Sequence, residues 1–259
     1  MHNFKVFVIN LASSAERLKH ITEQLGKFQV PFERIDAVDG RKLSDEEIEK
    51  YSPQSLVQQH YFRPLNKGEV GCSLSHQKAW QKILDDDLDF AIILEDDIYL
   101  KDNFKSIVEL MAELPTMDWD YIKLFPFKKG GESNVRDSIE YKGHRFVSYH
   151  KYPISAVGQI ISRRGAQALI KNMPYVVQPV DGHIKSWWEL DITPFGLSPY
   201  CIGIDVDGQS DINPGQQELN KLKQRKVHKI LLNWKRAFNR MLATPKLDKA
   251  FNQFKQQLK

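Results

Sequence analysis

Three acidic residues in succession, Glu95, Asp96 and Asp97, follow a run of five apolar residues at positions 90–94. Such a run is typical of a strand that is covered on both faces, as in the centre of an α/β sheet. In open α/β sheets, ligands bind beyond the carboxyl ends of the strands. Carboxylates crowded at such an edge raise one another's pKa unless a cation neutralises them, and oxygen ligands suit Mg²⁺ or Mn²⁺. The stretch therefore predicts a divalent-cation site.

The side chains of neighbouring strand residues point to opposite faces, so Glu95 and Asp97 are expected to share a side and to act as metal ligands. Asp96 would then face the other way. The alternative is structural: the three acids end a strand or cap the next helix, in which Asp102 is a further cap candidate. A second acidic run at 85–87 has no apolar run before it to bury it, and we interpret it as a solvated turn.

The elements that must position these carboxylates alternate between strand and helix, which predicts an α/β catalytic domain over residues 1–215. The first strand is expected at 4–9, and a capping box from Ser13 to Glu16 should begin the helix after it. Segment 52–68 is expected to be a loop. The other expected elements are strand 32–38 with a turn at 39–40, helix 43–51, a helix from 68 to 84, strand 90–94, strand 121–125, strand 156–162 and helix 163–170.

Composition indicates an ordinary globular protein: 41% of the 259 residues are hydrophobic and 27% are charged, which argues against disorder of the whole chain. The two cysteines, Cys72 and Cys201, are far apart and form no CxxC pair, so neither a disulfide framework nor a zinc site is indicated. The chain has no signal-peptide pattern and no apolar run of membrane-spanning length. We therefore expect a cytoplasmic protein.

Residues 216–259 differ from the rest of the chain and are expected to form a basic tail. They contain twelve Lys or Arg and two acidic residues, a balance of +10, which leaves −6 for residues 1–215. Apolar residues that recur at helical spacing predict an amphipathic helix with a cationic face. These residues are Val227, Ile230, Leu231, Trp234 and Phe238.

Such a helix suits an anionic membrane surface, and it would attach the protein peripherally to the inner face of the plasma membrane. The alternative is a helix that docks on the acidic body of the same protein. Nucleic-acid binding is not expected, because no RNA- or DNA-binding motif accompanies the charge.

Several motifs in one order resemble glycosyltransferase family 25, the lipooligosaccharide biosynthesis galactosyltransferases and their relatives. The motifs are VFVINLASSAERL at 6–18, RIDAVDG at 34–40, GEVGCSLSHQKAW at 68–80 and AIILEDDIYL at 91–100. Segments 158–166 and 178–181 resemble the second half of that family. The similarity extends over roughly residues 4–205.

The resemblance implies a GT-A-like nucleotide-sugar-binding fold in which Glu95, Asp96 and Asp97 take the part of the metal-binding D-x-D motif. The motif here begins with Glu95 in place of Asp, which leaves open whether Glu95 touches the metal or Asp96 replaces it; otherwise Asp96 would contact the donor. The implied reaction moves a hexose, galactose from UDP-galactose, to a lipooligosaccharide or lipopolysaccharide acceptor. The alternatives are a UDP-glucose-dependent glucosyltransferase, a sugar nucleotidyltransferase, and a catalytically silent relative that binds glycans or membranes.

Residues near the first two strand ends are donor-binding candidates under this resemblance. Asn10 and Arg17 lie at the first strand-to-helix turn, where helix N–H groups and a guanidinium could hold the diphosphate. Ala37 and Val38 border the second strand end, where a small residue could admit a uracil ring. Asp39 could bind ribose, or could simply belong to a turn.

The motif at 68–80 supplies further candidates. Gly68 and Gly71 flank a helix start where the backbone is expected to approach another group closely. Ser73 and His76 follow, and His76 is a candidate for contact with the diphosphate or the donor sugar. The alternative for His76 is a hydrogen-bonded residue of the core.

Asp181 and Glu189 are the nearest candidates for a catalytic base that accepts a proton from the acceptor hydroxyl. They flank a polar and aromatic cluster with His183, Trp187 and Trp188. Aromatic rings suit the apolar faces of sugars. The alternative is that the tryptophans form a buried structural cluster.

Overall fold

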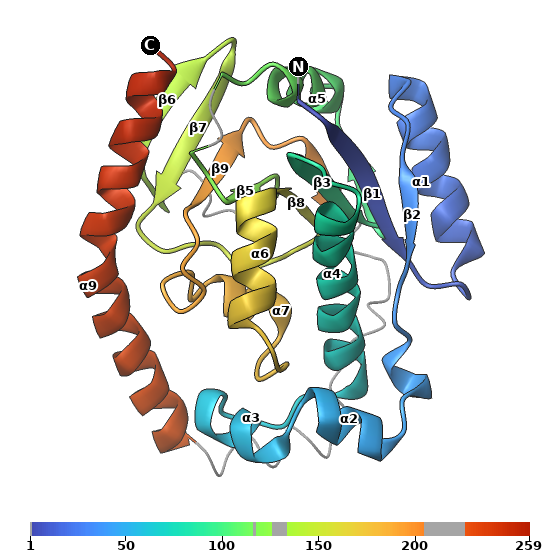
Figure 1. Ribbon diagram of the computed structural model, residues 1–259, viewed down its shortest axis with the longest axis vertical. Coiled ribbons are helices and arrows are strands. Elements are labelled where there is room, and N and C mark those ends of the chain that lie inside the picture. The colour runs from blue at the N-terminus through green and yellow to red at the C-terminus, as the bar shows by residue number, and fades with distance from the viewer. Residues whose placement is uncertain (1, 116–117, 126–133, 205–225) are drawn as a thin grey trace.

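The computed structural model describes residues 2–115, 118–125, 134–204 and 226–259. Within them, eight strands form one mixed sheet in the order β2-β1-β3-β8-β5-β9-β7-β6 (Figure 1). A short ribbon pairs two further strands, β4 and β10. The strands are β1 Phe4–Asn10, β2 Glu33–Asp36, β3 Phe90–Glu95, β4 Ile98–Leu100, β5 Tyr121–Lys123, β6 Val135–Tyr141, β7 His144–Tyr149, β8 Gly158–Ser162, β9 Pro194–Ser198 and β10 Ile202–Ile204.

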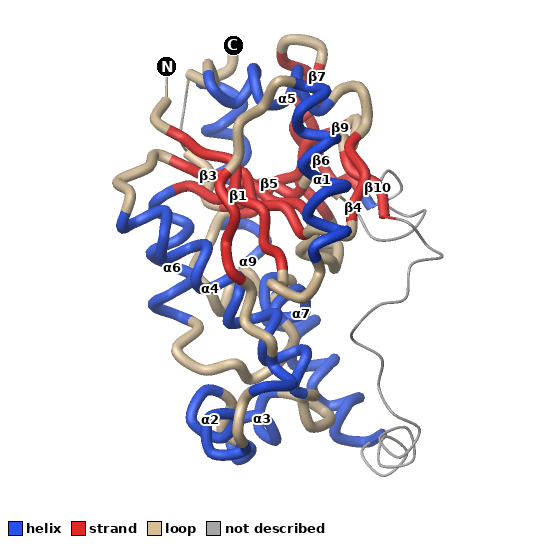
Figure 2. The backbone as a smooth tube through the Cα atoms, turned by 90° about the vertical axis from the view of Figure 1, so that its right-hand side faces the viewer, coloured by secondary structure: helices blue, strands red, loops and turns tan. Residues whose placement is uncertain are grey.

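Helices cover both faces of the sheet, with α4 and α6 packed together on one face and α1 and α5 on the other (Figure 2). Helices α2 and α3 lie beyond the end of the sheet (Figure 1). The expected α/β class, with a mixed central sheet and a C-terminal helix, is thereby confirmed. The helices are α1 Ala15–Phe28, the short 3₁₀ helix η1 Gly40–Lys42, α2 Asp45–Tyr51, α3 Gln54–His60, α4 Lys67–Asp85, α5 Phe104–Ala112, α6 Arg163–Asn172, α7 Val180–Ile184 and α9 Lys226–Gln257.

The strand order reverses at β1, and we use the word crevice for the place just beyond the carboxyl end of β1. Strand β1 lies between β2 and β3 and runs parallel to both. The chain passes from β1 through α1 to β2 on one side, and then through α4 to β3 on the other side. Where the connections diverge in this way, the carboxyl ends of the neighbouring strands leave room for a ligand. The acidic residues after β3 therefore lie at the edge where an α/β sheet places its site.

Two local predictions are wrong. No capping box joins Ser13 and Glu16: the N-cap of α1 is Ser14, whose side chain makes no capping hydrogen bond. Its carbonyl instead accepts a hydrogen bond from Asn10 Nδ2 at 3.0 Å, so the end of β1 holds this turn. Segment 52–68 is not a loop, because it contains α3 and the start of α4, which begins with a capping box between Asn66 and Glu69.

The basic tail contributes to the core through the last part of α9. Leu247, Phe251, Phe254 and Leu258 are buried, and the Phe251 ring packs 4.9 Å from that of Phe195 in β9. Helix α9 therefore follows the β6 end of the sheet (Figure 1). The expected boundary between residues 215 and 216 lies outside the described residues and stays a prediction. In the part of the chain that the structure describes, no helix is both long and apolar enough to cross a bilayer.

The start of α4 approaches the segment after β2 so closely that only glycine fits. An added Cβ on Gly71 would lie 2.5 Å from the Val38 carbonyl oxygen and 2.6 Å from the Gly40 nitrogen. Both are backbone atoms that cannot rotate away, and overpacking of this kind costs about 1–3 kcal/mol. We expect Gly71→Ala to lower the free energy of unfolding by about that amount, as measured by urea denaturation.

Gly26→Ala is the matched control. Gly26 also lies in a helix, but nothing lies within 4 Å of its added Cβ. Its replacement should be neutral or stabilising by up to ~1 kcal/mol, because alanine favours a helix. If Gly71→Ala were as stable as the unsubstituted protein, the close packing of α4 on this segment would be refuted.

Candidate active site

Four strands of the sheet end at the same edge. Asn10 ends β1, Asp36 ends β2, Glu95 ends β3 and Lys123 ends β5. The register of the strands aligns these ends, and β8, which runs antiparallel to β3 and β5, begins at the same edge with Gly158. Four carboxyl ends and one strand start therefore surround the crevice beside β1.

Asp96 is tied to the end of β1. Asn10 Nδ2 donates to Asp96 Oδ2 at 2.6 Å, and Arg17 Nη1 lies 3.8 Å from Asp96 Oδ1. Burial raises the pKa of Asp96, an effect that the Asn10 hydrogen bond and the Arg17 charge oppose. One oxygen is therefore occupied and the other faces a guanidinium, so Asp96 serves mainly to hold the acidic turn in place.

Glu95 is oriented by a buried chain of two side chains. Gln159 Nε2 lies 2.7 Å from His76 Nδ1, and His76 Nε2 lies 3.1 Å from Glu95 Oε1. Because the amide donates to Nδ1, the imidazole hydrogen is on Nε2 and is donated to the carboxylate. Gln159 and His76 are fully enclosed. His76 thus lies in the site, where it positions Glu95.

Asp97 carries a negative charge that its neighbours disfavour. Its side chain reaches solvent, yet the surrounding protein desolvates it and the charges of Glu95 and Asp96 repel it. Together these effects raise the pKa of Asp97 to about 6, with Arg17 opposing them. A cation at this position would relieve the repulsion.

The acidic residues after β3 supply oxygen atoms of the kind that a divalent cation prefers. Asp96 is engaged by Asn10, which leaves Glu95 and Asp97 as the oxygen ligands that such an ion would use. Cys72, His76 and Glu95 also place one possible ligand atom each within 4.8 Å of one another. However, burial and the nearby carboxylates raise the pKa of the Cys72 thiol, and a protonated thiol is a poor metal ligand. Glu95 and Asp97 stay the predicted metal ligands.

Asp181, in the first turn of α7, lies close enough that, in addition to burial, its charge, like that of Glu95, raises the pKa of both Cys72 and Tyr121. Its carboxylate accepts from the Ser155 N–H at 3.2 Å and from the Gly182 N–H at 2.7 Å. Ser155 lies in the segment before β8 and has a φ of 89°, a left-handed conformation that is uncommon for residues other than glycine. The side chain of Lys123 donates to the Ser155 carbonyl. The backbone at Ser155 is thus held from both sides, between the lysine and the carboxylate.

Lys123 is a site residue that no sequence motif predicts. Its side chain is 1% exposed, and its ammonium lies over the rings of Tyr121 and Tyr152, at 5.7 and 5.2 Å from their centroids. Burial lowers the pKa of Lys123 to about 7, while the negative charge of Asp181 opposes the shift. A lysine at the end of an apolar strand is the signal that could have marked it.

The segment after β2 lies next to the site but is largely occupied by its own contacts. The Ala37 N–H donates to the Asn10 carbonyl, and the Val38 N–H donates to Ser75 Oγ at 2.8 Å. Asp39 accepts two hydrogen bonds from the Arg41 guanidinium, which hold the pKa of that carboxyl below its usual range. The arrangement of Asp39 matches the turn that the sequence left as an alternative.

Helix α4 brings His76 to the site but not the other candidates of its motif. Gly68 lies in the first turn of α4, and Gly71 packs on the backbone of residues 38–40. Ser73 is buried and donates to the Glu69 carbonyl of its own helix at 2.9 Å. The close approach predicted for Gly71 is therefore made to protein backbone.

Glu189 is exposed on the turn that follows α7, and its N–H donates to the Ser186 carbonyl. The structure shows no contact that joins it to the acidic residues after β3. Trp187 is buried and meets Trp188 edge to face at 5.6 Å. The geometry thus separates the two base candidates and places only Asp181 at the strand ends.

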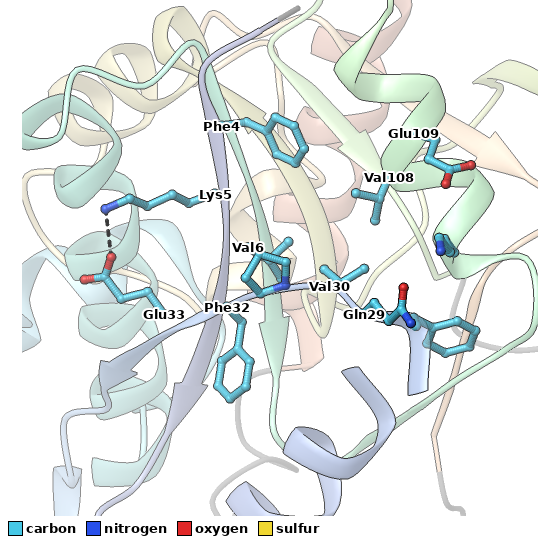
Figure 3. A pocket seen from close by; sticks show the side chains of 12 residues that line it. Phe4, Lys5, Val6, Gln29, Val30, Phe32, Glu33, Val108 and Glu109 are labelled. Atoms are coloured by element: carbon cyan, nitrogen blue, oxygen red, sulfur yellow. Dashed lines mark hydrogen bonds and ion pairs between the residues drawn. The ribbon is translucent and has the colours of Figure 1, made fainter. Parts of the chain in front are cut away.

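A hollow of about 570 Å³ lies away from these residues, between the start of β1, the segment after α1 and helix α5 (Figure 3). Most of its lining is apolar, including Phe4, Val6 and Phe32, and Lys5 pairs with Glu33 at 2.9 Å beside it. It lacks a converging set of carboxylates. The candidate active site is therefore assigned from the strand ends and not from the size of this hollow.

A family model described as "Glycosyltransferase family 25 (LPS biosynthesis protein)" matches residues 3–184. The match includes the strand ends, the acidic turn, His76 and Asp181. The chain belongs to glycosyltransferase family 25, as the motifs predict.

Curated relatives are about 30% identical to the chain over the residues that align. Procollagen galactosyltransferase 1-B of Xenopus laevis is 31% identical over 220 residues, which are 76% of this chain and 35% of that protein. The inactive glycosyltransferase 25 family member 3 of Mus musculus is 29% identical over 75% of this chain and 36% of its own length. A Haemophilus influenzae protein, whose name "Putative glycosyltransferase" gives only the class, is 28% identical over 89% of this chain and 84% of that protein. The chain thus spans about a third of the animal relatives.

Two solved structures overlap loosely with the chain. A glycosyltransferase that acts in glycosylation of the PBCV-1 major capsid has a TM-score of 0.43 and 10% identity, with 86% of this chain and 99% of that chain covered. A Drosophila galactosyltransferase solved with manganese, UDP-Gal and xylobiose has a TM-score of 0.41 and 9% identity, with 85% and 79% covered. These values are too low for an argument about the site.

The raised pKa of Asp97 predicts that the metal-free protein loses stability as pH rises from about 4 to about 6. The folded state keeps this proton up to about pH 6, whereas an unfolded aspartate loses it near pH ~3.9. The folded state therefore binds more protons in this window, and the free energy of unfolding falls through it. Asp97→Asn should remove this part of the pH dependence, measured by urea unfolding in EDTA.

Asp102→Asn is the control, because Asp102 is also exposed but lies outside the acidic turn. Its pH dependence should match that of the unsubstituted protein. An Asp97→Asn variant with the same pH dependence as this control would show that the charge of Asp97 is not disfavoured in the fold.

Proposed function

We propose that this protein transfers a hexose, galactose from UDP-galactose, to a lipooligosaccharide or lipopolysaccharide acceptor, with the assistance of Mn²⁺ or Mg²⁺. The observation that carries the proposal is the acidic turn at the end of β3. Glu95 ends β3 and Asp97 follows it beside the end of β1, and the fold disfavours the negative charge of Asp97. A nucleotide diphosphate bound with a divalent cation is the ligand that suits such an edge.

The chain offers groups for each part of the donor. Arg17, which lies 3.8 Å from Asp96, and the first turn of α1 would hold the diphosphate. Ala37 and Val38, partly exposed beside the end of β1, would border the uracil ring. When bound by Glu95 and Asp97, a divalent cation would stabilise the negative charge that develops on the departing diphosphate.

Asp181 is the group proposed to act on the acceptor. If the reaction inverts the anomeric centre, its carboxylate would accept the proton of the attacking hydroxyl. The Ser155 and Gly182 N–H groups hold that carboxylate, and Lys123 fixes the Ser155 backbone. Asp181 is preferred to Glu189, because Glu189 lies on the exposed turn after α7.

The names of relatives and of the family support the proposed sugar and the proposed acceptor. Procollagen galactosyltransferases of Danio rerio and Xenopus laevis support galactose as the transferred sugar. The words "LPS biosynthesis protein" in the family description support a lipopolysaccharide-type acceptor. UDP-glucose remains the alternative donor, since the residues that we assign to the donor would bind its nucleotide and diphosphate and not its hexose.

A catalytically silent glycan-binding protein is the second candidate function. It is favoured by the mouse relative that is named as inactive and that matches 75% of this chain. A sugar nucleotidyltransferase is a third possibility, which would need a second acidic metal site and would release pyrophosphate.

The test is UDP release from UDP-galactose and UDP-glucose, with lactose- or glucose-terminated acceptors, in Mn²⁺, in Mg²⁺ and in EDTA. We expect release from UDP-galactose that EDTA abolishes. Asp97→Asn should lower kcat/KM by about 100-fold or more, because charge stabilisation of the leaving group is lost. Asp102→Asn, the same change at an exposed residue outside the site, should leave kcat/KM unchanged.

Other results of this test would change the proposed cation, donor or reaction. Release that persists in EDTA would remove the cation from the mechanism, and preference for UDP-glucose would change the donor. Pyrophosphate as the product would indicate a nucleotidyltransferase. No release with any donor or acceptor would favour the silent glycan-binding protein, provided that the variant and the unsubstituted chain unfold cooperatively.

A further inference from the structure

The first half of α9 exposes a stripe of large apolar side chains, which we call the apolar stripe. All of its members are more than half exposed, and they recur every three or four residues over about 22 Å of helix. They are Val227, Ile230, Leu231, Trp234, Phe238, Met241 and Leu242, with exposed fractions of 71, 54, 61, 74, 57, 61 and 63%. Monomers in water seldom expose so continuous an apolar surface, and such patches mark interaction sites.

The opposite face of the same half contacts the protein through polar groups. Arg236 donates to the His60 carbonyl at 2.9 Å and to Gln178 Oε1 at 2.5 Å. The Lys229 ammonium lies 4.6 Å from the centre of the Phe62 ring. Two cations, Lys229 and Arg236, thus contact the body of the protein while the apolar stripe faces outward, which reverses the usual arrangement of a surface helix.

The reversal is confined to one half of the helix. From Leu247 onward, α9 places its apolar residues against the sheet, where Phe251 and Phe254 are essentially inaccessible. The Arg136 guanidinium of β6 binds both oxygens of Asp248 at 2.8 and 2.7 Å. The helix is therefore anchored in the fold, and its anchored half fixes which way the apolar stripe points.

The charges around the apolar stripe indicate what covers it. Residues 227–242 contain four basic residues, Lys229, Lys235, Arg236 and Arg240, and no acidic residue. Lys235 is exposed and directly follows Trp234, so a second copy docked on the stripe would bring two such cations close together, which opposes self-association. An anionic lipid surface would attract them and would also accept the apolar side chains and the indole of Trp234 at the boundary between water and hydrocarbon.

We infer that the apolar stripe docks on an anionic lipid bilayer, with the first half of α9 lying in the plane of the membrane surface. The docking needs no catalysis and is independent of the proposed function. One consequence does rest on that function: Arg236 binds Gln178, three residues before Asp181 in the chain. A membrane-held acceptor would thus be presented near α7.

The test is cosedimentation of the full chain with vesicles of phosphatidylcholine, with and without phosphatidylglycerol. We expect binding that needs the anionic lipid, that weakens with salt, and that shifts the Trp234 fluorescence to shorter wavelength. The double variant Leu231→Gln and Trp234→Gln should lower the bound fraction by about tenfold or more, because both apolar anchors are lost. Asn233→Gln, an exposed polar position on the same turn, should bind as the unsubstituted chain does.

Controls make the outcomes decisive. Both variants leave the buried half of α9 intact, and equal melting temperatures would confirm that they fold. Trp234→Phe should keep binding but lose the spectral shift. Binding that the double variant retains, or no binding to anionic vesicles, would overturn the proposal. Dimerisation without lipid that the double variant abolishes would assign the apolar stripe to a second copy instead. UDP release, measured on the same samples without vesicles, tests the proposed function separately.

Discussion

Asn10 is the residue on which the geometry of the crevice depends. It is 2% exposed, and its side-chain amide donates to both Asp96 and the Ser14 carbonyl. Its side-chain oxygen accepts from Arg34, and its main-chain carbonyl accepts from the Ala37 N–H. A single amide therefore joins the ends of β1 and β2, the turn into α1 and the acidic turn after β3. A buried network of this kind is rigid only when every member is satisfied, and this one is.

Three adjacent carboxylates have three different surroundings because of this constraint. Asp96 accepts a hydrogen bond from Asn10, and Glu95 accepts one from His76 on α4. Asp97 reaches solvent and is repelled by the charges of the other two. The sequence places them side by side, but the elements that hold them come from opposite faces of the sheet. A site can thus be built from one short turn, with supporting residues that determine which carboxylate is fixed and which remains available.

The strand before the acidic residues, and the position of those residues at its end, could be predicted from the sequence. The apolar run at 90–94 announces a buried strand, and the acids that follow it lie at the crevice as expected, since both features depend only on neighbouring residues. The support of Glu95 was not predictable, because Gln159 is 83 positions from its partner His76. The close contact of Gly71 was expected in kind, but its partner, the backbone at 38–40, is set by tertiary packing. The S-x-x-E pattern predicts Ser13 as the N-cap of α1, but the N-cap is Ser14, because Asn10 holds the turn through the Ser14 carbonyl.

Strand β9 has a consequence for how the chain folds. It is formed late in the sequence, at Pro194–Ser198, yet it lies between β5 and β7 in the sheet. Until β9 is in place, the β6–β7 hairpin has no hydrogen-bonded link to the rest of the sheet, and the free edges of β5 and β7 are open to pairing with other chains. Assembly of this sheet therefore waits for contacts between distant segments, which slows folding and lengthens the time during which aggregation competes.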